Sequence, residues 1–181
     1  MNSNSNFFAQ THREAVVRTC LCFIRCGEEV LLIRKKRGIG AGKINGPGGH
    51  LEPGETALEA AVRETQEELR VTPLDLKMMG ELSFQFVDES TGRDQQCDDG
   101  ISGALHTVVF LAEGYEGEPV ETAEATPHWI HQTKIPFHEM WEDDQYWLPG
   151  MLEGKMFKGF FHFDGDKMLS RCIEWGSFFD Y

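Results

Sequence analysis

The chain has 181 residues, 40% of them apolar and 26% charged, a globular composition that is long enough for one domain with a sizeable core. Its 30 Asp and Glu residues against 17 Lys and Arg residues give a net charge of −13, which argues against polymeric nucleic acid or an anionic membrane as partner. A small phosphorylated ligand is still compatible with this charge, because bound divalent cations reverse the local sign.

Targeting signals and cysteines indicate where the protein works. No stretch approaches the run of about 18 apolar residues that a membrane-spanning helix needs, and the polar start Met1–Asn6 does not resemble a signal peptide. The cysteines are five, an odd number without a CxxC pair, which favours reduced thiols. Cys20, Cys22 and Cys26 lie close together, but their alternation along an apolar segment favours core positions over a metal site. We therefore expect a cytoplasmic protein.

The first part of the chain predicts a β-hairpin followed by a loop. Residues 15–24 read as a strand, residues 26–29 supply a turn, and Val30–Ile33 return as a second strand. The glycine-rich segment 38–54 excludes a helix or a long strand. Because a strong helix follows it directly, this segment favours a loop whose backbone approaches a ligand over a loose linker.

That helix is predicted to begin after Thr56, which forms a capping-box pattern with Glu59. Helical spacing directs one stripe toward the core, with Thr65 as its imperfect member: Leu58, Ala61, Val62, Thr65 and Leu69. Pro73 is expected to stop the helix soon after Leu69.

The second half of the chain predicts further strands and a second helix. Residues 76–87 and 105–112 read as strands. The polar loop between them, residues 88–104, reads as a surface insertion more readily than as a lid over an active site. Residues 136–152 predict a loop that leads into an aromatic-rich helix.

A closing hairpin is predicted at the end of the chain. Its strands are residues 156–163 and 167–175, joined at Asp164-Gly165. The elements together predict one mixed α/β domain over residues 1–181, with a flexible segment at residues 1–14.

Three glutamates crowd one face of the first predicted helix. At about 100° per residue, Glu64, Glu67 and Glu68 fall within one sector, away from the apolar stripe. Like charges at this spacing repel each other, and Arg63, four residues before Glu67, neutralises only part of the charge. Hard divalent cations, Mg²⁺ or Mn²⁺ as its substitute, would suit the remainder. The alternative is a solvated acidic face, which the helix alone would favour.

The spacing of residues before this helix favours the metal site over the solvated acidic face. Gly49, five residues, Glu55, seven residues, and then Arg63-Glu64-Thr65-Gln66-Glu67-Glu68 resemble the box of the Nudix hydrolase family, G-x5-E-x7-R-E-U-x-E-E-x-G-U, in every charged position. Thr65 stands where an apolar residue is usual. Arg70 stands where glycine usually gives the helix a left-handed exit, so we expect this turn to be made otherwise.

The resemblance implies a Nudix α/β/α sandwich with a mixed β-sheet and a Mg²⁺-dependent hydrolase of nucleoside diphosphate linkages. It assigns the metal ligands to the backbone carbonyl of Gly48 and to glutamates, namely Glu64, Glu67, Glu68 and, on the metal side, Glu124. It makes one glutamate, with Glu67 favoured, the base that takes a proton from water. Glu55 and Arg63 would support this cluster.

Within the family, the segments around the box are similar to the animal-type MutT homologues, which hydrolyse oxidised purine nucleoside triphosphates such as 8-oxo-dGTP. This similarity spans roughly residues 30–163, apart from the inserted loop. It implies that Trp141 stacks on the base, that Asn45, Asp143 and Asp144 bind the purine edge, and that Lys35 lies near the phosphates.

Other positions complete the expected substrate site or depart from the relatives. Phe84 and Phe86 align with apolar pocket residues, one of which would touch the base, and Gly49 lies beside the substrate. His50 could contact phosphate or be an ordinary loop histidine. Ile39 replaces a phenylalanine, Pro47 is a further change, and the 88–104 insertion could reshape the pocket mouth, so the sequence leaves the choice between oxidised and unmodified purines open.

The sequence thus predicts a pyrophosphohydrolase that converts purine nucleoside triphosphates to the monophosphate and pyrophosphate. The alternatives are a Nudix hydrolase of ADP-ribose, a dinucleotide or capped RNA, and a non-catalytic domain that binds a nucleotide as a regulator. The intact glutamates argue against the regulator, and the acidic charge argues against RNA. The expected partner is a small nucleotide, with a monomer and a homodimer equally open.

Overall fold

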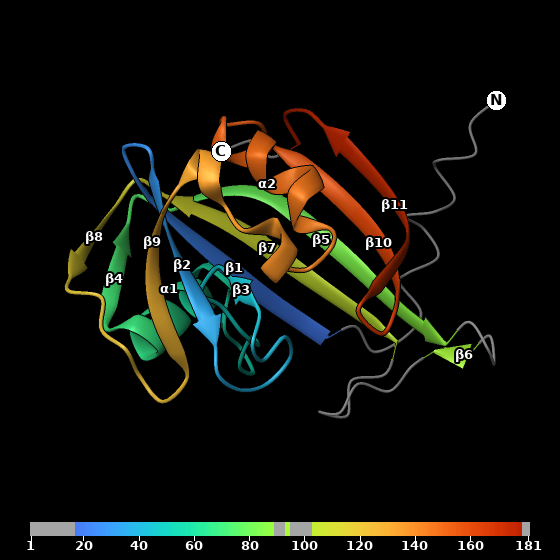
Figure 1. Ribbon diagram of the computed structural model, residues 1–181, viewed down its shortest axis with the longest axis horizontal. Helices are drawn as coiled ribbons and strands as arrows, with labels where there is room; N and C mark the ends of the chain where they lie inside the picture. The colour runs from blue at the N-terminus through green and yellow to red at the C-terminus, as the bar shows by residue number, and fades with distance from the viewer. Residues whose placement is uncertain (1–16, 89–92, 95–102, 179–181) are drawn as a thin grey trace.

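The computed structural model describes residues 17–88, 93–94 and 103–178, and a nine-stranded mixed sheet dominates it (Figure 1). The sheet has the order β11-β10-β5-β7-β1-β2-β3, with β6 added to β5 and β9 added to β2; β4 and β8 form a second, two-stranded sheet. The strands are β1 (Val17–Cys26), β2 (Glu29–Lys35), β3 (Ile44–Asn45), β4 (Val71–Leu74), β5 (Lys77–Asp88), β6 (Arg93–Asp94), β7 (Ala104–Ala112), β8 (Gly114–Gly117), β9 (Ala125–His131), β10 (Phe157–Asp164) and β11 (Lys167–Trp175).

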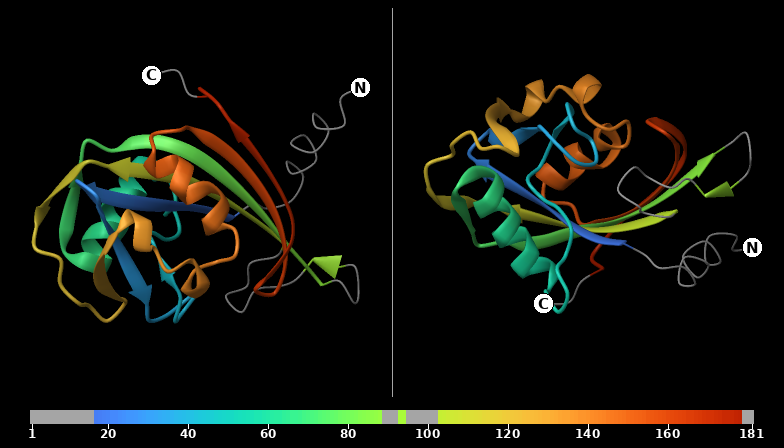
Figure 2. Two further views of the ribbon diagram at one scale, coloured as in Figure 1. Left: turned by 45° about the horizontal axis from the view of Figure 1, so that its top comes forward. Right: turned by 90° about the horizontal axis from the view of Figure 1, so that it is seen from below.

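Two α-helices cover opposite faces of the large sheet (Figure 2). Helix α1 (Ala57–Leu69) packs on the face that Cys20 and Cys22 of β1 present. Helix α2 (Asp144–Leu152) packs on the other face, where Trp147 meets Phe23 of β1. Two short 3₁₀-helices, η1 (Gln132–Lys134) and η2 (Phe137–Glu139), lead from β9 toward α2. This arrangement confirms the α/β/α sandwich.

The strand pairing explains how one sheet brings distant segments together. β1 runs parallel to β7, and β5 runs antiparallel to β7 and parallel to β10. Alternate residues of each strand point to opposite faces. Leu21, Leu82 and Phe84 accordingly lie on the α2 face, whereas Cys20 and Cys22 lie under α1.

Most of the predicted elements are confirmed. The first hairpin pairs Ile24 with Leu31, and the last pairs Phe157 with Trp175 and Asp164 with Lys167. The capping box of Thr56 and Glu59 is present at the start of α1. The strands β3, β4, β6, β8 and β9 were not expected from the sequence.

Two predictions about α1 are wrong. Leu58 is 46% exposed rather than buried, because the core face of α1 is formed by Ala60, Ala61, Thr65, Glu68 and Leu69. The helix exit also differs: Arg70 itself takes the left-handed conformation, with φ 63°, and its N–H donates to the Gln66 carbonyl. The helix therefore ends before Pro73, which lies in β4.

Some of the predicted segments include residues that the structure does not describe. These are the flexible segment 1–14, the first two residues of the predicted strand 15–24, and most of the 88–104 insertion. Of the insertion, the structure describes β6, whose Asp94 pairs with Val87 at the end of β5. Among the described helices, none is long and apolar enough to cross a membrane.

Candidate active site

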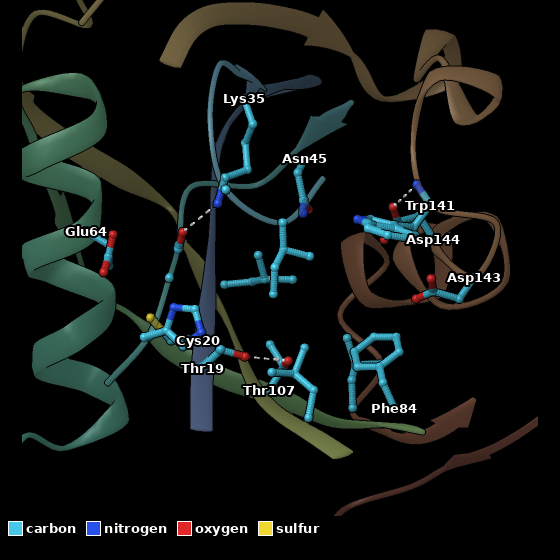
Figure 3. A pocket seen from close by; sticks show the side chains of 18 of the residues that line it. Thr19, Cys20, Lys35, Asn45, Glu64, Phe84, Thr107, Trp141, Asp143 and Asp144 are labelled. Atoms are coloured by element: carbon cyan, nitrogen blue, oxygen red, sulfur yellow. Dashed lines mark hydrogen bonds between the residues drawn. The ribbon is translucent and has the colours of Figure 1, made fainter. Parts of the chain in front are cut away.

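A cavity of about 450 Å³ lies between α1, the glycine loop, the sheet and the start of α2 (Figure 3). Its lining has two chemically different parts. The acidic end is formed by Lys35, Gly48, Glu64, Glu68 and Glu124. The aromatic end is formed by Asn45, Phe84, Trp141, Asp143 and Asp144, with Phe86 and Phe163 beside them.

The glycine loop is held against β1, which fixes its backbone beside α1. The Cys20 N–H donates to the Gly49 carbonyl at 2.9 Å, and the Cys22 N–H donates to the Pro47 carbonyl at 2.8 Å. A Cβ atom on Gly48 would lie 2.1 Å from the Cys20 carbonyl oxygen, and one on Gly49 would lie 2.5 Å from Glu64 Oε1. Only glycine fits at position 48, where the obstacle is backbone, and a side chain at position 49 would displace the Glu64 carboxylate, so the loop backbone itself becomes part of the acidic end.

Glu68 is a buried carboxyl group at the acidic end, with 2% of its surface exposed. Its Oε2 accepts a hydrogen bond from the Gly48 N–H at 2.9 Å. Burial raises the pKa of Glu68 to about 7, although the charge of Lys35 and the Gly48 hydrogen bond act in the opposite direction. The Lys35 ammonium lies 3.5 Å from the Gly48 carbonyl oxygen and 3.9 Å from Glu68 Oε1, so these two oxygens already share a cation.

Arg63 joins the other glutamates of α1 to the loop before the helix. Its guanidinium donates to both carboxylate oxygens of Glu55, at 2.8 and 2.9 Å, to Glu64 Oε1 at 2.8 Å and to Glu67 Oε2 at 3.3 Å. It also donates to the His50 carbonyl at 2.9 Å. These bonds hold the pKa of Glu55 at about 2, well below its usual value. Arg63 therefore links Glu55, Glu64 and Glu67 to the loop before the helix.

Most of the predicted metal ligands line the same cavity. Gly48, Glu64, Glu68 and Glu124 line the cavity, and Glu124 also forms an ion pair with Arg37. Glu67 does not line it: its side chain is 50% exposed on the surface of α1. Within the described residues, no three carboxylates converge on one point. The donors are nevertheless hard oxygens around a position that already attracts the Lys35 ammonium, and this chemistry fits Mg²⁺ or Mn²⁺.

At the aromatic end, Trp141 and Phe84 present ring surfaces to the cavity (Figure 3). Trp141 meets Phe163 edge to face, with ring centroids 5.8 Å apart. Phe84 stacks on Phe161 at 5.6 Å. Asn45 borders the same space, and its Oδ1 accepts the Gly46 N–H at 2.8 Å. Such a slot suits a flat, aromatic ligand.

Two buried carboxyl groups lie beside these rings. Asp143 Oδ2 accepts from Trp147 Nε1 at 2.9 Å, while its Oδ1 is buried with no hydrogen-bond partner among the described residues. Burial raises the pKa of Asp143 to about 6. The pKa of Asp144 is raised well above its usual value by burial and by the charge of Asp143. Because burial favours the protonated form of both groups, the pair can offer a carboxylate acceptor next to a protonated donor.

The chain is similar to known proteins of one family. Residues 14–151 match the NUDIX domain family. The chain belongs to that family. Two relatives are named oxidized purine nucleoside triphosphate hydrolase. The one from Danio rerio is 44% identical over 77% of this chain and 82% of its own length. The one from Mus musculus is 39% identical over 81% of this chain and 86% of its own length. The crystal structure of a MutT protein from Bacillus halodurans superposes with a TM-score of 0.74 at 26% identity, covering 88% of this chain and 98% of that one.

Sequence reasoning missed several residues of this Nudix site. The hydroxyl groups of Thr19 and Thr107 lie 2.7 Å apart on the cavity floor, and neither belongs to a motif. Their pairing follows from the parallel register of β1 and β7, which the sequence does not reveal. Ile39 and His50, singled out as departures from related proteins, both line the cavity.

Proposed function

We propose that this Nudix protein is a Mg²⁺-dependent pyrophosphohydrolase that converts purine nucleoside triphosphates, including oxidised ones such as 8-oxo-dGTP, to the monophosphate and pyrophosphate. The observation that carries the proposal is the two-ended cavity, which joins a slot for a flat base to a cluster of glutamates. A nucleotide has the same two-part chemistry, with an aromatic base at one end and an anionic phosphate chain at the other. The names of the two animal relatives support the same substrate class.

At the acidic end, Gly48, Glu64, Glu68 and Glu124 would hold the metal ions, together with Glu67, which lies outside the cavity lining on the same helix as Glu64 and Glu68. When bound, Mg²⁺ would offset the charge of the phosphates and lower the pKa of a bound water. Glu67 is the favoured base for this water, since it is exposed and, among the described residues, makes one contact, at 3.3 Å to Arg63. Arg63 keeps Glu64 and Glu67 in place by bonding to both. Lys35, Gly49 and His50 would lie along the phosphates.

At the aromatic end, Trp141 would stack on the purine and Phe84 would face it across the slot. Asp143 would accept from N–H groups of the purine edge through its unpaired Oδ1. Protonated Asp144 would donate to a ring nitrogen or an oxo group, and Asn45 can do either. A pyrimidine would leave part of this buried polar set unpaired, which disfavours it.

The setting of the protein is part of the same proposal. Cys20 and Cys22 are buried free thiols, which supports a reducing cytoplasm. The acidic surface supports a small nucleotide rather than a nucleic acid or membrane as partner.

A panel of nucleotides tests the proposal. Purified protein with Mg²⁺ is given 8-oxo-dGTP, dGTP, dATP, dTTP and ADP-ribose, and the products are separated and identified. We expect the purine triphosphates to yield monophosphate and pyrophosphate, with dTTP the poorer substrate. Preferred cleavage of ADP-ribose would overturn the substrate class. Binding of a nucleotide without turnover would overturn the proposed enzymatic activity and favour a non-catalytic regulator.

A further inference from the structure

Lys43 lies against the aromatic end but belongs to neither the Nudix box nor the cavity lining. Its ammonium nitrogen is 4.8 Å from the centre of the Trp141 ring, within the range of a cation–π contact. The same nitrogen lies 3.0 Å from Oδ2 of Asp166, in the turn between β10 and β11. Lys43 is therefore held between a cavity residue and a distant turn.

The neighbouring contacts fix the same tryptophan. A Cβ atom on Gly40 would lie 3.0 Å from Trp141 Nε1, so the glycine loop packs closely on the ring. Glu142 Oε2 accepts the Met168 N–H at 2.9 Å, which ties the residue after Trp141 to β11. The glycine loop and the β10–β11 turn thus meet at Trp141, and Lys43 forms the link through Asp166.

We propose that Lys43 is a positioning residue for base recognition, and this rests on the proposed function. Held by Asp166, its ammonium group fixes the Trp141 ring as the platform on which the purine stacks. In this proposal the cation contacts one face of the indole, 4.8 Å from the ring centre, and the purine stacks on the other face. A positioned platform strengthens binding of the base, while the chemistry at the acidic end is unaffected.

Three variants test this, with a matched control. Lys43→Met removes the charge and keeps the length of the side chain, Lys43→Arg restores a cation that stacks on indole, and Asp166→Asn releases the anchor. The control is Lys158→Met: Lys158 lies 5.5 Å from the Phe178 ring and 3.4 Å from Glu81, the same pair of contacts outside the cavity. KM and kcat are measured with 8-oxo-dGTP and dGTP, and thermal unfolding confirms that each variant is folded.

We expect Lys43→Met to raise KM about three- to tenfold, with kcat within about twofold, because a partly buried cation–π contact has this strength. Lys43→Arg should recover most of the loss, Asp166→Asn should give a smaller rise, and Lys158→Met should change neither constant. Unchanged KM in Lys43→Met, or equal losses in the Met and Arg variants, would overturn the proposal.

Calorimetry with the monophosphate 8-oxo-dGMP separates this proposal from the proposed function, because binding of a product needs no turnover. Weaker binding in Lys43→Met with recovery in Lys43→Arg supports the platform even if the wild-type protein hydrolyses no triphosphate. Equal binding by wild type and Lys43→Met removes the platform even if hydrolysis is confirmed.

Discussion

Asp143 and Asp144 are adjacent buried residues whose carboxyl groups bind different donors: Asp143 accepts from the Trp147 indole at 2.9 Å and Asp144 from the Trp141 backbone N–H at 3.0 Å. Each is thus fixed by a different tryptophan, and both border the same cavity. Burying two charged carboxylates side by side raises the free energy of the folded protein. The pKa values of both groups are therefore raised, and the pair retains protons that exposed aspartates would lose.

This proton uptake predicts a pH dependence of stability. The pKa of Asp143 rises from 3.8 to about 6 on folding, so the folded protein binds more protons than the unfolded chain in that window. Its contribution to the free energy of unfolding is complete below the lower value and is lost as the pH rises through the upper one. Asp143→Asn, which stays neutral, should flatten the fall in stability across this window in urea unfolding at several pH values. The exposed Glu116→Gln on β8 is the control, and an unchanged slope in Asp143→Asn would contradict the prediction.

The grouping of charged residues on α1 was predictable because their spacing is local. Helical spacing brings Glu64, Glu67 and Glu68 near one another, and Arg63 reaches Glu55, Glu64 and Glu67. The expectation that all three glutamates lie away from the core is wrong for Glu68, which is buried on the core face, whereas Glu67 faces solvent. The capping box fixed the start of α1 for the same reason.

The remaining features depend on contacts between distant segments. Arg70 takes a conformation that its own propensity disfavours, and the strand β4 begins directly after it. Lys43 contacts both Trp141 and Asp166, which lie far from it in the sequence. The short strand β9 could not be predicted because its pairing with β2 brings together residues about a hundred positions apart. Its preceding residue, Glu124, reaches the cavity through that pairing.

Glu67 should be essential for turnover but not for folding. Its side chain is half exposed and, within the part of the chain that the structure describes, contacts Arg63 alone at 3.3 Å, so Glu67→Gln leaves the core unchanged. We expect kcat to fall by about two to four orders of magnitude, since both a proton acceptor and a metal ligand are lost. The measurement is the rate of pyrophosphate release under saturating Mg²⁺, with circular dichroism as the folding control. Activity close to that of the wild type would show that another glutamate is the base.

Trp141 should contribute to binding of the base more than to chemistry. Stacking on an aromatic side chain is worth about 1–3 kcal/mol per base, which corresponds to a rise in KM of roughly five- to 150-fold in Trp141→Ala. Trp141→Phe retains a ring and should recover much of this. Steady-state kinetics with dGTP and 8-oxo-dGTP provide the comparison. The same KM in Trp141→Ala as in the wild type would remove this residue from the pocket.

Thr107 should contact the sugar of the nucleotide. Its hydroxyl pairs with that of Thr19 at 2.7 Å on the cavity floor, where both side chains are more than nine-tenths buried. Figure 3 shows the two threonines between Glu64 and Phe84, where the sugar must lie if phosphates and base occupy the two ends. The other contact of Thr19 is a long one, 3.5 Å to the His106 carbonyl, so the pair can accept a further hydrogen bond.

Thr107→Val keeps the shape of this side chain and removes its hydroxyl, and it should lower kcat/KM for dGTP about three- to tenfold, the range for one buried neutral hydrogen bond. Comparison with GTP and 2′,3′-dideoxy-GTP identifies the group that is bound. A loss with dGTP and GTP indicates the 3′-hydroxyl, and a loss with GTP alone indicates the 2′-hydroxyl. Thr72→Val, on β4 and outside the cavity lining, should leave all three rates unchanged. If Thr107→Val lowers the three rates equally, the dideoxy substrate included, the hydroxyl pair supports the sheet and does not bind the sugar.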